Sequence, residues 1–144
     1  MAITSAICNS FKVEILTATH NFTASSGNTF NLALYTSSAT LNKSTTAYTT
    51  SNEVATATGY TAKGKALTSV TPVLSSDTAV CDFANVSWTS ASFTARGCLI
   101  FNDTATGDPA VCAIDFGGDK TVTSGTFTIE FPAAAASTAI VAIA

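Results

Sequence analysis

The sequence predicts an all-β fold, an antiparallel β-sandwich of jelly-roll-like type with one long irregular loop. Apolar and polar residues alternate over short runs, which is the period of strands that bury one face. Thr, Val, Ile and Phe dominate these runs, as is typical of pleated surfaces, and turn-forming residues separate them. No linker, repeat or change of composition divides the chain. We therefore expect a single domain of residues 1–144, with an N-terminal arm at 1–10 and the long loop at 37–65.

The strands follow from this alternation, taken in chain order. In the first, Phe11, Val13 and Ile15 alternate with Lys12 and Glu14, which places the two charges on a solvent face. The predicted strands are 11–15, 30–36, 66–73, 79–83, 90–102, 110–116, 127–131 and 138–143. The predicted turns lie at 25–28, 75–77, 103–109, 117–119 and 123–125.

Residues 38–54 do not alternate. Leu41, Thr45, Tyr48 and Asn52 recur at helical spacing, but Thr and Ser are poor helix formers. We therefore expect an irregular loop with one helical turn that continues to residue 65. Loops of this length are usually functional or docked on another surface.

Residues 91–116 are expected at the centre of the fold, as two paired strands with a bulge at Arg96-Gly97. The register places Cys98 and Cys112 on one face with Ile100, Ile114 and Phe116, and it places Leu99, Phe101, Val111 and Ala113 on the other. Because both faces are apolar, we expect the second sheet to cover one and a loop or another subunit to cover the other. The diagonal spacing of the two cysteines is at the upper limit for a disulfide.

Charge is scarce in this chain. Lys and Arg number 6 and Asp and Glu number 9 among 144 residues, whereas a soluble domain usually carries about a quarter charged residues. The few scattered basic residues and the pI of about 4.7 exclude binding of nucleic acid through its phosphates. A hydrophobic content of 47% excludes disorder.

The termini predict neither export nor a membrane partner. No basic segment precedes an apolar stretch at the N-terminus, so we expect no signal peptide. The Ala-rich tail at 133–144 is too short to span a bilayer. In a chain made in the cytosol, the cysteines at 8, 81, 98 and 112 are expected to be reduced thiols.

No motif indicates an enzyme or a cofactor. His20 is the only histidine, no nucleophile motif accompanies it, and we expect a structural hydrogen bond there. Glu14, Glu53 and Glu130 suggest no pair of catalytic carboxylates. The run 59–65 matches the GxxxxGK part of a phosphate-binding loop, but Ala66 replaces the Ser or Thr that binds magnesium and no helical pattern follows.

Two further hypotheses stay open at this stage. The acidic turns at 102–108 and 115–119 could hold calcium weakly through oxygen ligands, or they could be ordinary Asx turns. Trp88 with Tyr35, Tyr48 and Tyr60 could form an aromatic platform for sugars. These four residues are also our candidates for an interaction interface, together with the Ala-rich tail.

Several runs of residues follow one another in a recognisable order. They are FKVEIL at 11–16, TFNLALYTSSATL at 29–41, NEV at 52–54 before GY at 59–60, SWT at 87–89 before TARG at 94–97, and DFG at 115–117 before FTIEFP at 127–132. Over residues 11–143, the chain resembles a group of small virion structural proteins of tailed bacteriophages.

This resemblance implies a protein that is built into the virion and has no catalytic role. We expect a capsid decoration or cement protein that forms a homo-oligomer and binds the major capsid protein or other virion proteins. The alternative is a structural protein associated with the tail, connector or fibre, which could include a module that binds host glycans. Low charge agrees with a permanent assembly, because interface cores are depleted in Lys, Glu and Asp.

Overall fold

Two antiparallel sheets and one short helix make up the computed structural model, which confirms the predicted all-β, sandwich-like fold. The structure describes residues 2–57 and 59–144; Met1 of the expected arm and Thr58 of the expected loop lie outside the described residues. The elements are β1 (Ala6–Ile7), α1 (Asn9–Leu16), β2 (Phe30–Tyr35), β3 (Lys65–Ala66), β4 (Ser69–Ser75), β5 (Thr78–Phe83), β6 (Val86–Asn102), β7 (Ala110–Ile129) and β8 (Val141–Ile143).

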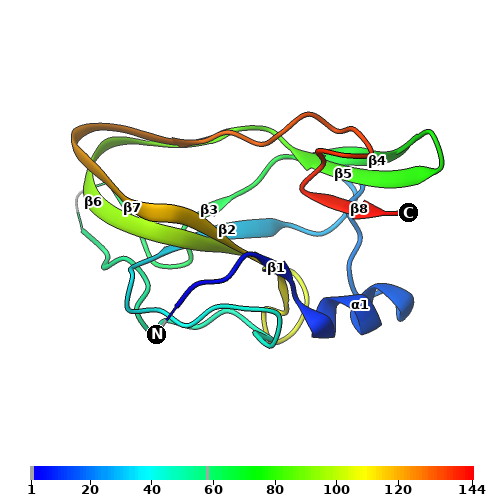
Figure 1. Ribbon diagram of the computed structural model, residues 1–144, viewed down its shortest axis with the longest axis horizontal. Coiled ribbons are helices and arrows are strands. Elements are labelled where there is room, and N and C mark those ends of the chain that lie inside the picture. Colours follow the sequence, from blue (N-terminus) through cyan, green and yellow to red (C-terminus); the bar gives the residue numbers. More distant parts are fainter. Residues whose placement is uncertain (1, 58) are drawn as a thin grey trace.

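The five-stranded sheet has the order β1-β7-β6-β2-β3, and the smaller sheet has the order β4-β5-β8. Figure 1 shows the small sheet above one end of the larger sheet, with α1 below it at the same end. Residues of the two layers meet in a shared core that includes Leu32, Leu34, Phe83, Trp88 and Val141.

The β6–β7 ribbon belongs to both layers because it bends back over the large sheet (Figure 1). Gly97 lies opposite Asp115, whereas Ala95 lies opposite Lys120, so β7 contains a bulge across from the predicted bulge at Arg96-Gly97. Gly117 inside this bulge has φ +80, and Ser124 further along β7 has φ 45. The predicted turns at 117–119 and 123–125 are therefore wrong: these turn-forming residues bend one continuous strand.

The central strand pair has the predicted register. Cys98 lies opposite Ile114 and Ile100 lies opposite Cys112, so the two cysteines are diagonal neighbours on one face. That face packs toward the bent-over part of β7, and Phe116 contacts Phe127 with ring centroids 6.3 Å apart. On the other face, the long loop places Tyr48 on Phe101. A sheet layer and a loop thus cover the two apolar faces, as the sequence predicts.

The predicted strand at 11–15 is wrong, because these residues lie in α1. One helical turn separates Phe11 from Ile15, so both point to the core, whereas Val13 is 64% exposed. Five alternating residues fit a strand and one face of a short helix equally well, and tertiary packing decides between them.

The N-terminal arm and the long loop are both docked on the sheet. Ile3 forms a bridge with Leu41, and β1 pairs with β7, so the arm extends the large sheet. The loop between β2 and β3 is irregular as predicted, but its described residues contain no helical turn. It is held by a bridge between Tyr35 and Glu53 and another between Ala47 and Pro109.

Gly64 allows the end of this loop to approach β2. It has φ +66, and a Cβ there would overlap the carbonyl oxygen of Leu32. We expect Gly64→Ala to lower the free energy of unfolding by about 3 kcal/mol or more, since it combines a backbone clash with a strained φ. Chemical denaturation measures this loss.

Gly107→Ala is the matched control for this prediction. Gly107 has φ +85, but a Cβ would meet nothing within 4 Å. It should cost only about 1 to 2 kcal/mol, the strain of the left-handed conformation alone. Equal losses for the two variants would contradict the close docking of the loop.

Candidate functional site

The carboxylate of Glu53 fastens the long loop to the edge of β2. Its Oε2 accepts a hydrogen bond from the Tyr48 hydroxyl (2.6 Å), and its Oε1 accepts from the Tyr60 hydroxyl (2.7 Å) and the Lys63 N–H (2.8 Å). The Tyr60 oxygen in turn accepts from the N–H of Leu34 (2.9 Å). Glu53 therefore satisfies three donors from separate parts of the loop.

Three of the four candidate interface residues lie inside the protein, and the fourth, Tyr48, is half-buried against it. Tyr35, Tyr60 and Trp88 are 0%, 2% and 1% exposed, and the rings of Tyr60 and Trp88 are 6.2 Å apart. The Tyr35 hydroxyl donates to the Thr49 carbonyl (2.7 Å), and Tyr48 stacks on the sheet through Phe101. Because their faces are covered by the chain itself, these rings do not form an exposed platform for a sugar.

The first acidic turn binds the side chain of a lysine from the long loop. The Lys63 ammonium lies 2.8 Å from Asp103 Oδ1 and 2.8 Å from Asp108 Oδ2. These two carboxylates raise the pKa of Lys63, mainly through their hydrogen bonds to it. The ammonium thus lies where the calcium hypothesis for this turn places a metal ion.

The second acidic turn is paired in the same way. Arg96 Nε lies 3.0 Å from Asp115 Oδ1, and a second guanidinium nitrogen lies 3.8 Å from Asp119. The hydrogen bond from the Gly117 N–H lowers the pKa of Asp115 most, and the hydrogen bond from Arg96 lowers it further. In the described part of the chain, no three His, Cys, Asp or Glu residues are grouped as metal ligands would be.

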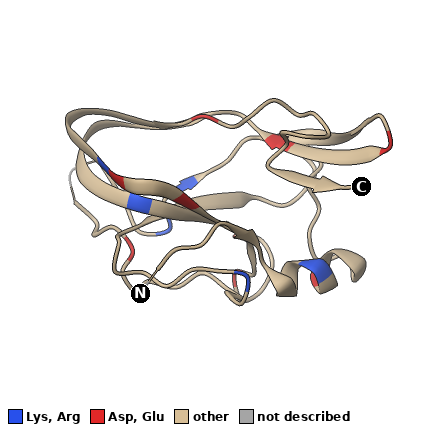
Figure 2. Ribbon diagram, viewed as in Figure 1, with Lys and Arg blue, Asp and Glu red and all other residues tan. Residues whose placement is uncertain are grey.

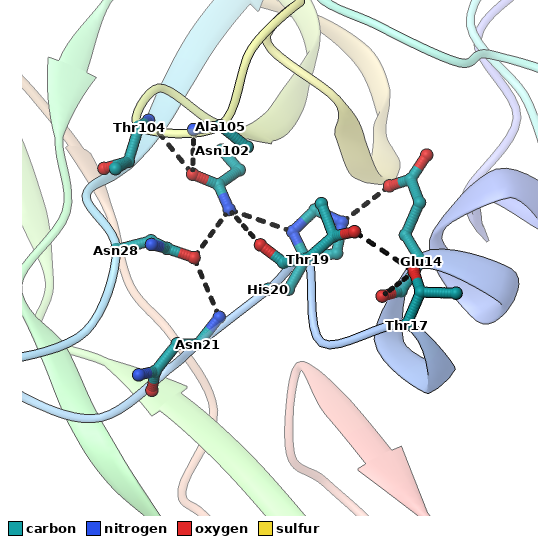
Figure 3. Close-up of polar contacts among 9 residues, drawn as sticks. All are labelled: Glu14, Thr17, Thr19, His20, Asn21, Asn28, Asn102, Thr104 and Ala105. Carbon is teal, nitrogen blue, oxygen red and sulfur yellow. Dashed lines mark hydrogen bonds and ion pairs between the residues drawn. The ribbon is translucent and has the colours of Figure 1, made fainter.

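His20 lies at the centre of a buried polar cluster between α1 and the end of β6 (Figure 3). Its Nε2 is 2.6 Å from Glu14 Oε2, and its Nδ1 is 3.1 Å from the amide nitrogen of Asn102. Because the Asn102 amide is a donor, Nδ1 accepts and Nε2 donates to the carboxylate. Glu14, expected on a solvent face, instead points to His20.

The orientation of the Asn102 amide is fixed by its other contacts. Its Oδ1 accepts from the N–H groups of Thr104 (3.0 Å) and Ala105 (3.1 Å), and its nitrogen donates to Asn28 Oδ1 (2.9 Å). Both ring nitrogens of His20 are consequently engaged, and neither faces a hydroxyl or thiol nucleophile. The arrangement supports the predicted structural role of His20 and does not resemble a catalytic triad.

The four cysteines are unpaired, as predicted. Burial raises the pKa of Cys8 and of Cys81 to about 11 and that of Cys112 to about 12, and it also raises the pKa of Cys98. A thiol with a raised pKa is a poor nucleophile near neutral pH. These residues act as small apolar groups of the fold.

The exposed large apolar side chains lie on α1 and on the small sheet, which Figure 1 shows at the same end of the molecule. We call this part of the molecule the apolar end. Leu74 and Ile143 lie on the face of the small sheet toward α1, whereas Val70 and Val73 lie on the opposite face. The exposed large apolar residues of the apolar end are Val13, Leu16, Val70, Val73, Leu74 and Ile143. A groove of about 330 Å³ separates α1 from β8, lined by Phe11, Lys12, Ile15, Leu16, Val141 and Ile143 among others. The sequence did not predict this surface, because residues 11–15 were expected to form a half-buried strand. Leu16 breaks the apolar–polar alternation and was the one residue that indicated an exposed apolar side chain here.

Comparison of the chain with protein-family models, curated proteins and solved structures gives no match. Within residues 2–57 and 59–144, no helix has the length and apolar character needed to cross a membrane. Functional inference therefore depends on the surface and on the resemblance of the sequence runs.

The tyrosines around Glu53 predict a loss of stability in alkali. Burial, followed by the hydrogen bond to Glu53, raises the pKa of Tyr48 from 10.0 to about 12, and burial also raises the pKa values of Tyr35 and Tyr60. Since the unfolded state loses these protons first, the free energy of unfolding is unaffected below pH 10 and should fall as the pH rises toward 12. Denaturation at a series of pH values measures this slope.

Tyr48→Phe provides the control, because it removes one ionising group and should make the slope shallower. The absorbance of tyrosinate gives an independent readout, as it should rise together with unfolding. Ionisation near pH 10 in the still-folded protein would contradict the network around Glu53.

The His20 cluster predicts a large cost for truncating Asn102, which is fully buried. Asn102→Ala should lower the free energy of unfolding by about 2 to 4 kcal/mol, since it leaves buried donors and acceptors unpaired. Asn21→Ala is the matched control: Asn21 is exposed and makes one local bond to the Thr23 N–H, so the loss should be below about 1 kcal/mol. Similar losses of unfolding free energy in the two variants would show that the His20 cluster does not stabilise the fold.

Proposed function

We propose that the chain is a structural protein of a tailed-phage virion, and that it decorates the head by binding the major capsid protein. In this role it forms a homo-oligomer, closes gaps between shell subunits and stabilises the head against internal pressure. The observation that carries the proposal is the apolar end: several large apolar side chains are exposed there, on a chain whose histidine and whose Lys63 are engaged internally.

The distribution of charge supports an assembled state. Lys63 is paired with a carboxylate of the turn after β6, Arg96 is paired with a carboxylate of β7, and Glu14 is paired with His20. Figure 2 shows the remaining charges scattered over a largely uncharged ribbon. A free protein with so few exposed charges is weakly protected against association, whereas a subunit in a permanent assembly benefits from surfaces that need little desolvation.

A protein of the tail or connector would also use exposed apolar residues and low surface charge. The experiments below therefore distinguish these positions in the particle from the head. A glycan-binding role is not favoured, because three of the four aromatic rings that would contact the sugar are buried and Tyr48 is half-buried. No catalytic role is proposed, since the only histidine has both ring nitrogens bonded within the fold.

The proposal predicts that the purified protein binds to heads that lack it. Particles are produced from the encoding phage with this gene deleted, mixed with the protein and sedimented. The protein should co-sediment with the heads and raise the temperature at which they release DNA, because a bound protein that bridges subunits stabilises the assembled state. Particles that already carry the protein are the control and should take up little more.

Absence of both binding and stabilisation would overturn the head-decoration role. Labelled protein located by electron microscopy on the tail or connector would assign it to that part of the virion instead. A two-, three- or fivefold unit is expected for decoration, whereas a six- or twelvefold ring indicates the tail or connector.

A further inference from the structure

The small sheet has two free edges, and both lie at the apolar end. In the described part of the chain, β4 and β8 each pair with β5 and with no other strand. An edge strand presents unpaired N–H and C=O groups that can pair with a strand of another chain. Each edge also carries exposed apolar side chains, with Val73 and Leu74 on β4 and Ile143 on β8.

The two edges match in length. β8 consists of three residues, Val141–Ile143. On β4, Pro72 lacks an N–H and interrupts any ladder on this strand, which leaves Val73, Leu74 and Ser75 before the hairpin turn. A short parallel ladder between the end of β4 in one copy and β8 in another is therefore compatible with both strands. Because β4 and β8 run in the same direction within the small sheet, this ladder leaves the same face of the sheet toward α1 in both copies.

The side chains on these edges also match the groove. Leu74 lies opposite Ala79, and Ala79 lies opposite Ile143, so the three side chains share one face of the small sheet. Ala79 and Ile143 line a cavity together with Ile15 of α1, which identifies this face as the one toward the helix. A β4 strand added beside β8 can direct its Leu74, which is 73% exposed, into the groove of about 330 Å³ next to Leu16.

Charge favours this hairpin as the occupant of the groove. Lys12 is the one charged residue among those that line the groove. Glu14, on the same helix, is held by His20. The turn of the β4–β5 hairpin carries the exposed Asp77. A hairpin placed along the groove thus brings a carboxylate toward the Lys12 ammonium, which donates to the uncharged Asn9 Oδ1 (3.3 Å).

We propose that copies of this chain associate head to tail, with the β4–β5 hairpin of one copy docked between α1 and β8 of the next. The inference rests on the self-association that is part of the proposed function and assigns its surface and its partner, a second copy. Because the two contacting surfaces differ, the interface is heterologous and generates a closed ring or an open chain.

A charge exchange tests the pairing between Lys12 and Asp77 in purified protein without capsids. Wild-type protein should form oligomers in analytical ultracentrifugation. Lys12→Glu and Asp77→Lys should each weaken association by about tenfold or more, because each places like charges together. The double variant Lys12→Glu/Asp77→Lys should recover most of the lost affinity, which a merely destabilised fold would not do.

A mixing experiment tests whether the two surfaces differ. Leu16→Asp damages the groove and Leu74→Asp damages the hairpin, so each variant alone should be monomeric. A mixture contains one intact groove and one intact hairpin per pair, and native mass spectrometry should show a 1:1 dimer and no larger species. Val13→Asp is the matched control, since Val13 is an exposed residue of the same helix that does not line the groove; it should associate like the wild type.

A wild-type protein that stays monomeric at every concentration would overturn the inference. So would oligomers that survive Leu74→Asp, or a mixture of the two defective variants that stays monomeric. These outcomes remain separate from the test of the proposed function. Capsid binding by a monomeric wild type would support head decoration and overturn the contact between copies. Self-association without capsid binding would support the contact between copies and overturn head decoration.

Discussion

The continuous β6–β7 ladder is the constraint on which the rest of this structure depends. One end of the ladder forms the centre of the large sheet, and the other end bends back to help cover it, so the same two strands supply both layers. Bulges at Gly117 and Ser124 allow the bend without ending the strand. The bend encloses Trp88 and Phe127 between the layers, and the remaining strands pair with or pack against this frame.

Much of this frame could be predicted from the sequence, because strand period and register are local properties. Alternation located β2, β5 and both central strands, and it placed Cys98 and Cys112 on the same face. The bend could not be predicted in this way. Gly117-Gly118 and Ser124-Gly125 have the composition of hairpin turns, and only the partner strand, far away in the sequence, shows that they are bulges.

The candidate site was less predictable, since it depends on contacts between distant segments. Tyr48, Tyr60 and Trp88 were identified as aromatic residues that could gather, and they do gather. Glu53 accepts hydrogen bonds from Tyr48 and Tyr60 and so holds the loop in place. No local pattern distinguishes a carboxylate that is bonded in this way from one in solvent. The same holds for Glu14 and His20, which meet only because residues 9–16 form a helix.

Exposed apolar residues at the end of the molecule need an explanation other than folding. Leu16 is 87% exposed and Leu74 is 73% exposed, so neither gains much from burial in the folded chain. A single residue of this kind is ordinary, but the apolar end concentrates several beside two unpaired strand edges and a groove. Each of these features favours association with another surface, and the proposed contact between copies would use all of them. If copies associate as proposed, contact with a neighbour removes these side chains from water, which folding of the single chain does not do.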